Sequence, residues 1–128
     1  TFAFTEIDTN NLLNLKKNIA FKSNINIFTD ENRLRVRGNG YQTDLNNINS
    51  KIVLIGDSVP FGWSLNYKDS LAGHLEKLNN TYQIINASVP SYSPKQSSKK
   101  FFSEFSNVKI YLCGVRLMFL RLCEKFML

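Results

Sequence analysis

The chain has 128 residues, of which 43% are hydrophobic and 20% are charged, and its formal net charge is +6. This length suits one small domain with a single core, and the hydrophobic content excludes a chain that is disordered throughout. The basic residues are scattered and form neither a run nor an RNA-binding motif, so we expect no dedicated nucleic-acid surface.

The first fifty residues are polar and rich in Asn, and we expect them to form a lead-in segment to a main domain at residues 51–128. Four apolar residues are spaced to line one face of a short helix: Leu12, Leu13, Leu15 and Ile19. Residues 25–28 are expected to form a short strand and residues 29–32 a turn. Leu34 and Val36 then alternate with three arginines, which is the period of a half-exposed strand. These arginines are Arg33, Arg35 and Arg37.

A continuous apolar run extends from Ile52 to Ile55. Apolar and β-branched residues without alternation are typical of a strand that is buried on both faces of a parallel sheet. Gly56, Asp57 and Ser58 follow this run directly. Because open α/β sheets place their sites at the carboxyl ends of such strands, the sequence predicts a site immediately after this one.

A helix is predicted over residues 69–78, with Asp69 or Ser70 as its N-terminal cap. Its apolar face is expected from three leucines at helical spacing: Leu71, Leu75 and Leu78. Residues 82–87 are predicted to form a second buried strand. Strand, helix and strand in this order make a βαβ unit, so the two strands should be parallel.

The rest of the chain is predicted as a loop at 88–98, a helix at 99–105 and a third strand at 108–113. The helix is expected to bury three aromatic residues: Phe101, Phe102 and Phe105. The apolar stretch at 110–128 contains Arg and Lys residues as well as Glu124, so we expect no membrane span. The two cysteines, Cys113 and Cys123, are expected to be small buried apolar residues.

Ser58 is the candidate nucleophile. A serine hydroxyl is a weak nucleophile by itself, and it needs a positioned base together with donors for the developing oxyanion. Gly56 allows the backbone to turn tightly after the strand, and Gly62 allows the following segment to pack closely. Asp57 is expected to hydrogen-bond the turn, as Asx residues do, rather than to act as a catalytic acid.

Residues 51–96 resemble the SGNH hydrolase superfamily, also called GDSL-type esterases. The likeness lies in a Gly-Asp-Ser block with a glycine four residues after the serine, an aromatic pair around that glycine, and an Ile-Asn-Ala strand end before the second block. The residues that carry it are Gly56-Asp57-Ser58 with Gly62, Phe61-Gly62-Trp63, and Ile85-Asn86-Ala87.

This resemblance implies an α/β fold, specifically a three-layer α/β/α sandwich with a parallel sheet of the flavodoxin-like kind. It also implies hydrolysis of carbohydrate, lipid or other small-molecule esters through an acyl-enzyme on Ser58. The oxyanion would accept from the Ser58 N–H, from a second-block position that holds Ser91 here, and from a third-block Asn. A serine at position 91 still offers its N–H, provided that its backbone adopts the angles that the site needs.

The chain departs from the family in its later blocks. The nearest candidate for the third block, Gly114-Val115-Arg116, has Arg at the Asn position, and no Asp-x-x-His element supplies a base. The single histidine, His74, falls in the middle of a predicted helix and is expected to lie on its surface or to be partly buried, away from Ser58. Because loss of the base costs on the order of 10⁶ in kcat, we expect little or no activity. We also expect this chain to be the N-terminal part of an incomplete domain, truncated or disrupted after about Lys100; the apolar, basic tail from Cys113 is equally consistent with a divergent natural ending, so the sequence leaves open whether the chain is full-length or a fragment.

Two other functions stay open: a non-catalytic module that binds a partner on the same fold, and a basic interaction domain unrelated to esterases. Three aromatic residues near the proposed site either line a pocket or cover the sheet edge: Trp63, Tyr67 and Tyr92. The sequence shows no metal-ligand cluster and no phosphate-binding loop, so no cofactor is expected. It leaves open the acyl and alcohol groups, the compartment and the oligomeric state.

Overall fold

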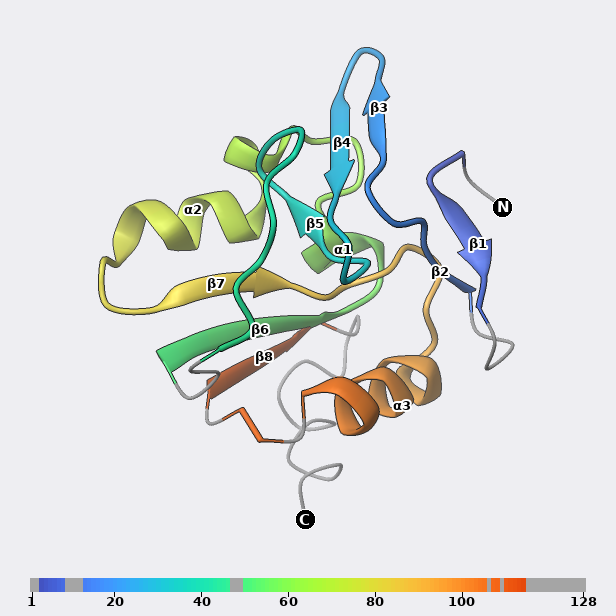
Figure 1. Cartoon of the computed structure of the whole chain (residues 1–128). Helices are drawn as coiled ribbons and strands as arrows, with labels where there is room; N and C mark the ends of the chain where they lie inside the picture. The colour runs from blue at the N-terminus through green and yellow to red at the C-terminus, as the bar shows by residue number, and fades with distance from the viewer. Residues whose placement is uncertain (1–2, 9–12, 47–49, 106, 109, 115–128) are drawn as a thin grey trace.

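The computed structural model describes residues 3–8, 13–46, 50–105, 107–108 and 110–114, with only the backbone described at 110–114. Its main feature is a six-stranded sheet in the order β3-β4-β5-β7-β6-β8, beside a separate two-stranded hairpin, β1-β2 (Figure 1). The strands are β1 (Thr5–Ile7), β2 (Leu13–Leu15), β3 (Ala20–Lys22), β4 (Asn26–Thr29), β5 (Arg35–Val36), β6 (Lys51–Gly56), β7 (Gln83–Asn86) and β8 (Ile110–Gly114). The helices are α1 (Ser58–Phe61), the 3₁₀ helix η2 (Tyr67–Asp69), α2 (Leu71–Leu78) and α3 (Pro94–Glu104).

The predicted buried strand is confirmed as β6, which lies between β7 and β8 and is parallel to both. The predicted βαβ unit is therefore present as β6, α2 and β7. Backbone hydrogen bonding on both edges and side-chain burial on both faces explain why the run from Ile52 to Ile55 has no polar alternation.

The two longer helices cover opposite faces of the parallel strands (Figure 1). Val53 and Ile55 of β6 pack with Phe101 and its neighbours on the α3 side. Leu54, between them in the strand, packs with Ala72 on the α2 side. Successive side chains of a strand point to opposite faces, so one strand supplies both cores. The α/β character is thus confirmed.

The sheet as a whole is mixed, in contrast to the parallel sheet that was expected. β3, β4 and β5 come from the first fifty residues, and they join it through the antiparallel pairings β3-β4, β4-β5 and β5-β7. The predicted strand at 25–28 is confirmed as β4. Among the described strands, parallel pairing is found for β6 with β7 and β6 with β8, and these strands are joined by helical crossovers.

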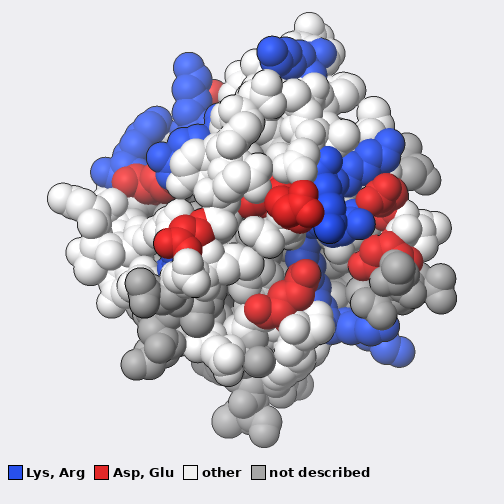
Figure 2. Space-filling model, viewed as in Figure 1, with Lys and Arg blue, Asp and Glu red and all other residues white. Residues whose placement is uncertain are grey.

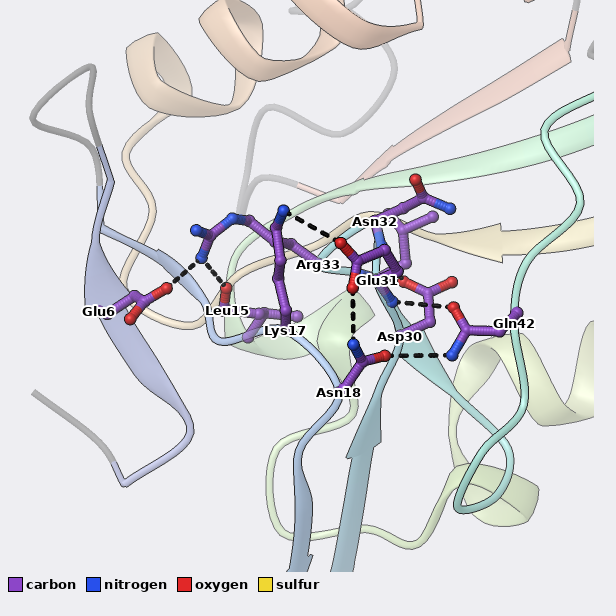
Figure 3. Close-up of polar contacts among 10 residues, drawn as sticks. Glu6, Leu15, Lys17, Asn18, Asp30, Glu31, Asn32, Arg33 and Gln42 are labelled. Atoms are coloured by element: carbon purple, nitrogen blue, oxygen red, sulfur yellow. Dashed lines mark hydrogen bonds and ion pairs between the residues drawn. The ribbon is translucent and has the colours of Figure 1, made fainter.

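The helix expected around Leu13 and Leu15 was wrong, since these residues form β2 of the hairpin. Because Leu13 and Leu15 are two residues apart, both lie on the strand face that packs against Phe4 and Ile27. Arg33 attaches this hairpin to the sheet, since its Nη1 donates to Glu6 Oε1 at 2.5 Å and to the Leu15 carbonyl at 2.7 Å (Figure 3).

The helices predicted at 69–78 and 99–105 both exist, with different bounds or faces. Ser70 caps α2 by accepting from the Gly73 N–H. The predicted leucine face was wrong for Leu71 and Leu78, which are exposed, whereas Leu75 is partly buried and packs against the core cluster of Leu54. The fully buried residues of α2 are Ala72 and Gly73. A Cβ on Gly73 would lie 2.2 Å from the Tyr67 carbonyl oxygen, so this face presses too closely on η2 to admit large side chains.

Helix α3 begins at Pro94, inside the stretch that was expected to be a loop. Ser93 accepts from the Gln96 N–H while the Gln96 side chain accepts from the Ser93 N–H, a capping box that ends the loop early. Phe101 and Phe105 are buried as expected, and Phe102 is exposed.

Charged side chains of both signs are interspersed on the face shown in Figure 2. Within the described residues, no helix has the length and apolar character that a bilayer crossing requires. The side chain of Cys113, and all of Cys123, lie outside the described residues.

Candidate active site

Ser58 is the first residue of α1, which starts directly after β6 and the N-cap Asp57. Asp57 Oδ1 accepts from the Val59 N–H at 3.0 Å, so the carboxylate holds the turn as predicted. Ser58 is partly exposed, and its hydroxyl has no hydrogen-bond partner among the described residues. The hydroxyl is therefore accessible, and no described group restrains it.

Gly62 closes this short helix in the left-handed region, with φ of 86°. Its N–H donates to the carbonyls of Ser58 (3.2 Å) and Val59 (3.1 Å). A Cβ on Gly62 would lie 2.7 Å from Ser70 Cβ and 2.9 Å from Arg35 Nη1. Backbone angle and close packing both require glycine here, in agreement with the sequence prediction.

Arg35 supports this turn through hydrogen bonds, a role that the sequence pattern did not predict. The alternation predicted an exposed side chain, yet Arg35 is 1% exposed. Its Nη1 donates to the carbonyls of Phe61 (2.8 Å) and Gly62 (2.9 Å), and its Nη2 donates to that of Leu65 (2.6 Å). The guanidinium also lies 4.9 Å from the centre of the Phe61 ring. Burial lowers the pKa of Arg35 to about 10, so it stays charged at neutral pH.

Asn86 supports the same turn from β7. Its Nδ2 donates to the carbonyls of Pro60 (3.3 Å) and Phe61 (3.2 Å), and its Oδ1 accepts from the Ser88 N–H at 3.2 Å. The side chain is buried. Asn86 thus links the helix that follows Ser58 to the loop that leads to Ser91.

The loop after β7 runs beside the end of β6. The Ala87 N–H donates to the Leu54 carbonyl at 2.9 Å, and the Val89 N–H donates to the Gly56 carbonyl at 3.0 Å. Ser58 and Ser91 each lie two residues beyond this second hydrogen-bonded pair. Their segments therefore meet at the same carboxyl edge of the sheet.

Ser91 adopts the left-handed backbone conformation, with φ of 71°, and it is exposed. In the resembled family this position holds glycine, for which such an angle carries no steric cost. The serine keeps the conformation, and its N–H has no hydrogen-bond partner among the described residues. Ser91 is thus able to offer a backbone donor at this edge.

Other predicted residues have mixed outcomes. Gly114 pairs with Gly56 and so ends β8 at the same edge, whereas Val115 and Arg116 lie outside the described residues. His74 is exposed on α2, and no hydrogen bond joins it to Ser58. Of the three aromatic candidates, Trp63 is exposed, and Tyr67 and Tyr92 are buried.

A cavity of about 420 Å³ lies away from Ser58, between the first strands and the end of α3. Its residues are Lys17, Glu31, Asn32, Arg33, Leu45, Glu104 and Phe105. Its two cations already have partners, since Lys17 pairs with Glu31 and Arg33 with Glu6 (Figure 3). Within the described part of the chain, no group of three or more His, Cys, Asp or Glu residues is placed to hold a metal ion.

Comparison of the chain with protein-family models and with curated proteins finds no match. A functional assignment therefore depends on the motif around Ser58 and on the geometry of the sheet edge.

Proposed function

We propose that this protein is a serine ester hydrolase of the SGNH type, with Ser58 as the nucleophile. The observation that carries the proposal is the hydrogen bond from the Val89 N–H to the Gly56 carbonyl. This bond brings the segment of Ser58 and the segment of Ser91 to one edge of the sheet, where a nucleophile and an oxyanion donor must meet.

The arrangement of layers supports the same proposal. Helices α2 and α3 cover opposite faces of the parallel strands β6, β7 and β8, as a three-layer α/β/α sandwich requires. The antiparallel strands β3 to β5 extend this unit on one side. We propose that the parallel part corresponds to the core of the SGNH fold.

In the proposed reaction, Ser58 Oγ attacks the ester carbonyl carbon, and the negative charge develops on the carbonyl oxygen. The N–H groups of Ser58 and Ser91 donate to that oxygen. The C–O bond to the alcohol then breaks, the alcohol leaves with a proton, and water later hydrolyses the acyl-enzyme and restores Ser58. No described residue is hydrogen-bonded to Ser58 Oγ as a base, so its proton passes to solvent. A low rate is expected, because the base supplies most of the acceleration in such sites.

The test is hydrolysis of p-nitrophenyl acetate by the wild type, Ser58→Ala and Ser23→Ala, each with and without imidazole as an external base. Ser23 is an exposed serine in the β3-β4 turn, so Ser23→Ala controls for the removal of a hydroxyl elsewhere. We expect imidazole to raise the rate of the wild type and of Ser23→Ala above that of Ser58→Ala. Subtracting the Ser58→Ala rate removes the direct reaction of imidazole with the ester.

Equal rates in all three proteins, with imidazole present, would contradict the nucleophilic role of Ser58. The alternative would then be preferred, namely a non-catalytic module that binds a ligand at the same sheet edge. An acetyl group on Ser58 after quenching, detected by mass spectrometry, would support the acyl-enzyme directly.

A further inference from the structure

Exposed apolar side chains gather in the segment that follows Ser58. Val59 is 74% exposed and Trp63 is 43% exposed. Four of the nine large apolar side chains that are exposed among the described residues fall between positions 59 and 71: Val59, Trp63, Leu65 and Leu71. Isolated exposed apolar residues are ordinary, but a group of them beside a reactive side chain indicates a binding surface.

The backbone brings two of these residues within one helical turn of the nucleophile. Val59 is the next residue in the chain, and the Trp63 N–H donates to the Ser58 carbonyl at 3.0 Å. Helix α1 is only four residues long, so its two ends lie close together. An acyl chain that extends from an ester carbonyl at Ser58 thus has two exposed apolar residues within one helical turn of its starting point.

An aromatic stack holds Trp63 in place. The Trp63 ring centre lies 6.2 Å from that of Phe4, and the Phe4 ring stacks on Phe61 at 5.8 Å. Phe4 and Phe61 are buried, so the stack connects the surface indole to the core. Trp63 thus contributes its apolar face with little freedom left to lose on binding.

Charge is absent from this segment, since residues 58–66 include no Asp, Glu, Lys or Arg. Nothing in it favours a charged substituent, and the exposed atoms favour a hydrocarbon chain. We infer that the Ser58 edge binds the uncharged, apolar acyl chain of its ester substrate on Val59 and Trp63. This inference depends on the proposed function for the position of the ester carbonyl, and it adds the substrate class.

The test uses Trp63, the single tryptophan of the chain, as its own reporter. Octanamide and acetamide are neutral, stable analogues of an acyl group, and their binding is followed by tryptophan emission. We expect octanamide to shift the tryptophan emission to the blue in a saturable manner. Octanamide should bind at least about tenfold more tightly than acetamide, because each fully buried methylene group raises the affinity by about fourfold.

Val59→Ser is the informative variant, and Leu78→Ser is its matched control. Leu78 is 82% exposed at the end of α2, so both variants remove an exposed apolar side chain. We expect Val59→Ser to weaken octanamide binding by about three- to tenfold and Leu78→Ser to leave it unchanged. Equal affinities for the two amides, or equal effects of the two variants, would overturn the inference.

Ester turnover separates this inference from the proposed function. Binding of octanamide without any Ser58-dependent turnover would contradict the hydrolase and leave the acyl-binding surface standing. Ser58-dependent turnover that stays constant from p-nitrophenyl acetate to the octanoate would support the hydrolase and overturn the apolar acyl site. A rise in kcat/KM of about two- to fourfold per methylene would support both.

Discussion

The Arg35 guanidinium and the Gly62 backbone meet directly beneath the turn that follows Ser58. Arg35 Nη1 donates to the Gly62 carbonyl at 2.9 Å, and a Cβ on Gly62 would also lie 2.9 Å from that nitrogen. An arginine from β5 and a glycine at the end of α1 therefore define the turn together. This contact connects the first fifty residues of the chain to the candidate active site.

Arg35→Met should lower the free energy of unfolding by about 3 kcal/mol, because the carbonyls of Phe61, Gly62 and Leu65 would lose a buried charged donor. Arg37→Met is the control, since Arg37 pairs with Glu76 at 3.1 Å while half-exposed. An exposed pair contributes about 1 kcal/mol or less. Urea unfolding followed by circular dichroism measures both values, and equal losses would contradict the proposed support of the turn.

Gly62→Ala should destabilise the fold by about 2–4 kcal/mol, since the new methyl group meets Ser70 Cβ and Arg35 at a left-handed backbone angle. Gly40 has a similar φ of 80°, and a Cβ at this position would have nothing within 4 Å. Gly40→Ala should therefore lower the free energy of unfolding by about 1 kcal/mol, through the strain of the left-handed backbone alone. Thermal unfolding of the two variants separates close packing from backbone strain, and similar melting temperatures would show that packing around Gly62 is not limiting.

Lys100 should make stability depend on pH. It is 2% exposed, its Nζ donates to Asn14 Oδ1 at 3.2 Å, and burial lowers its pKa to about 8 in spite of nearby Glu104. Between pH 8 and the ordinary lysine pKa of 10.5, the unfolded chain binds more protons than the folded one, so stability should rise with pH across that window.

Lys100→Met should remove this rise and should be the more stable protein at pH 7, by up to the order of 3 kcal/mol. Asn14 Oδ1 keeps a partner in the variant, because it also accepts from the Leu15 N–H at 2.9 Å. Urea unfolding at intervals from pH 7 to 10 gives the difference in the free energy of unfolding between the two proteins. Tyrosine titration is common to both proteins and therefore cancels in this difference. A constant difference across this range would refute the role assigned to Lys100.

Ser91→Gly should stabilise the protein by about 1 kcal/mol, because glycine adopts the left-handed conformation of this position without steric cost. Ser64 has a similar φ of 65°, and Ser64→Gly should give a similar gain. Ser91→Gly keeps the backbone N–H, so Ser58-dependent turnover of p-nitrophenyl acetate in imidazole should be retained. A marked loss of turnover would indicate that the Ser91 side chain, rather than its amide, acts at the site.

Local patterns predicted the βαβ unit well. The apolar run at 52–55, the cap at Ser70 and the strand around Ile84 and Ile85 are each dictated by burial or by hydrogen bonding within a few residues. The same patterns located Ser58 at a strand end and Gly62 at a turn. They failed for Leu71 and Leu78, because the close approach of α2 to η2 selects small residues, and helical spacing alone does not reveal that approach.

The sequence by itself determined where the parallel strands lie, which serine follows the central one, and that Asp57 holds the turn. Only the tertiary structure decided that β3 to β5 join the same sheet, that Arg35 is buried beneath Ser58, and that the loop of Ser91 runs beside Gly56. The reason is physical: capping acts on neighbouring residues, whereas the β5-β7 pairing, the bond of Arg35 to the Phe61 carbonyl and the bond of Val89 to Gly56 join residues 26 or more positions apart.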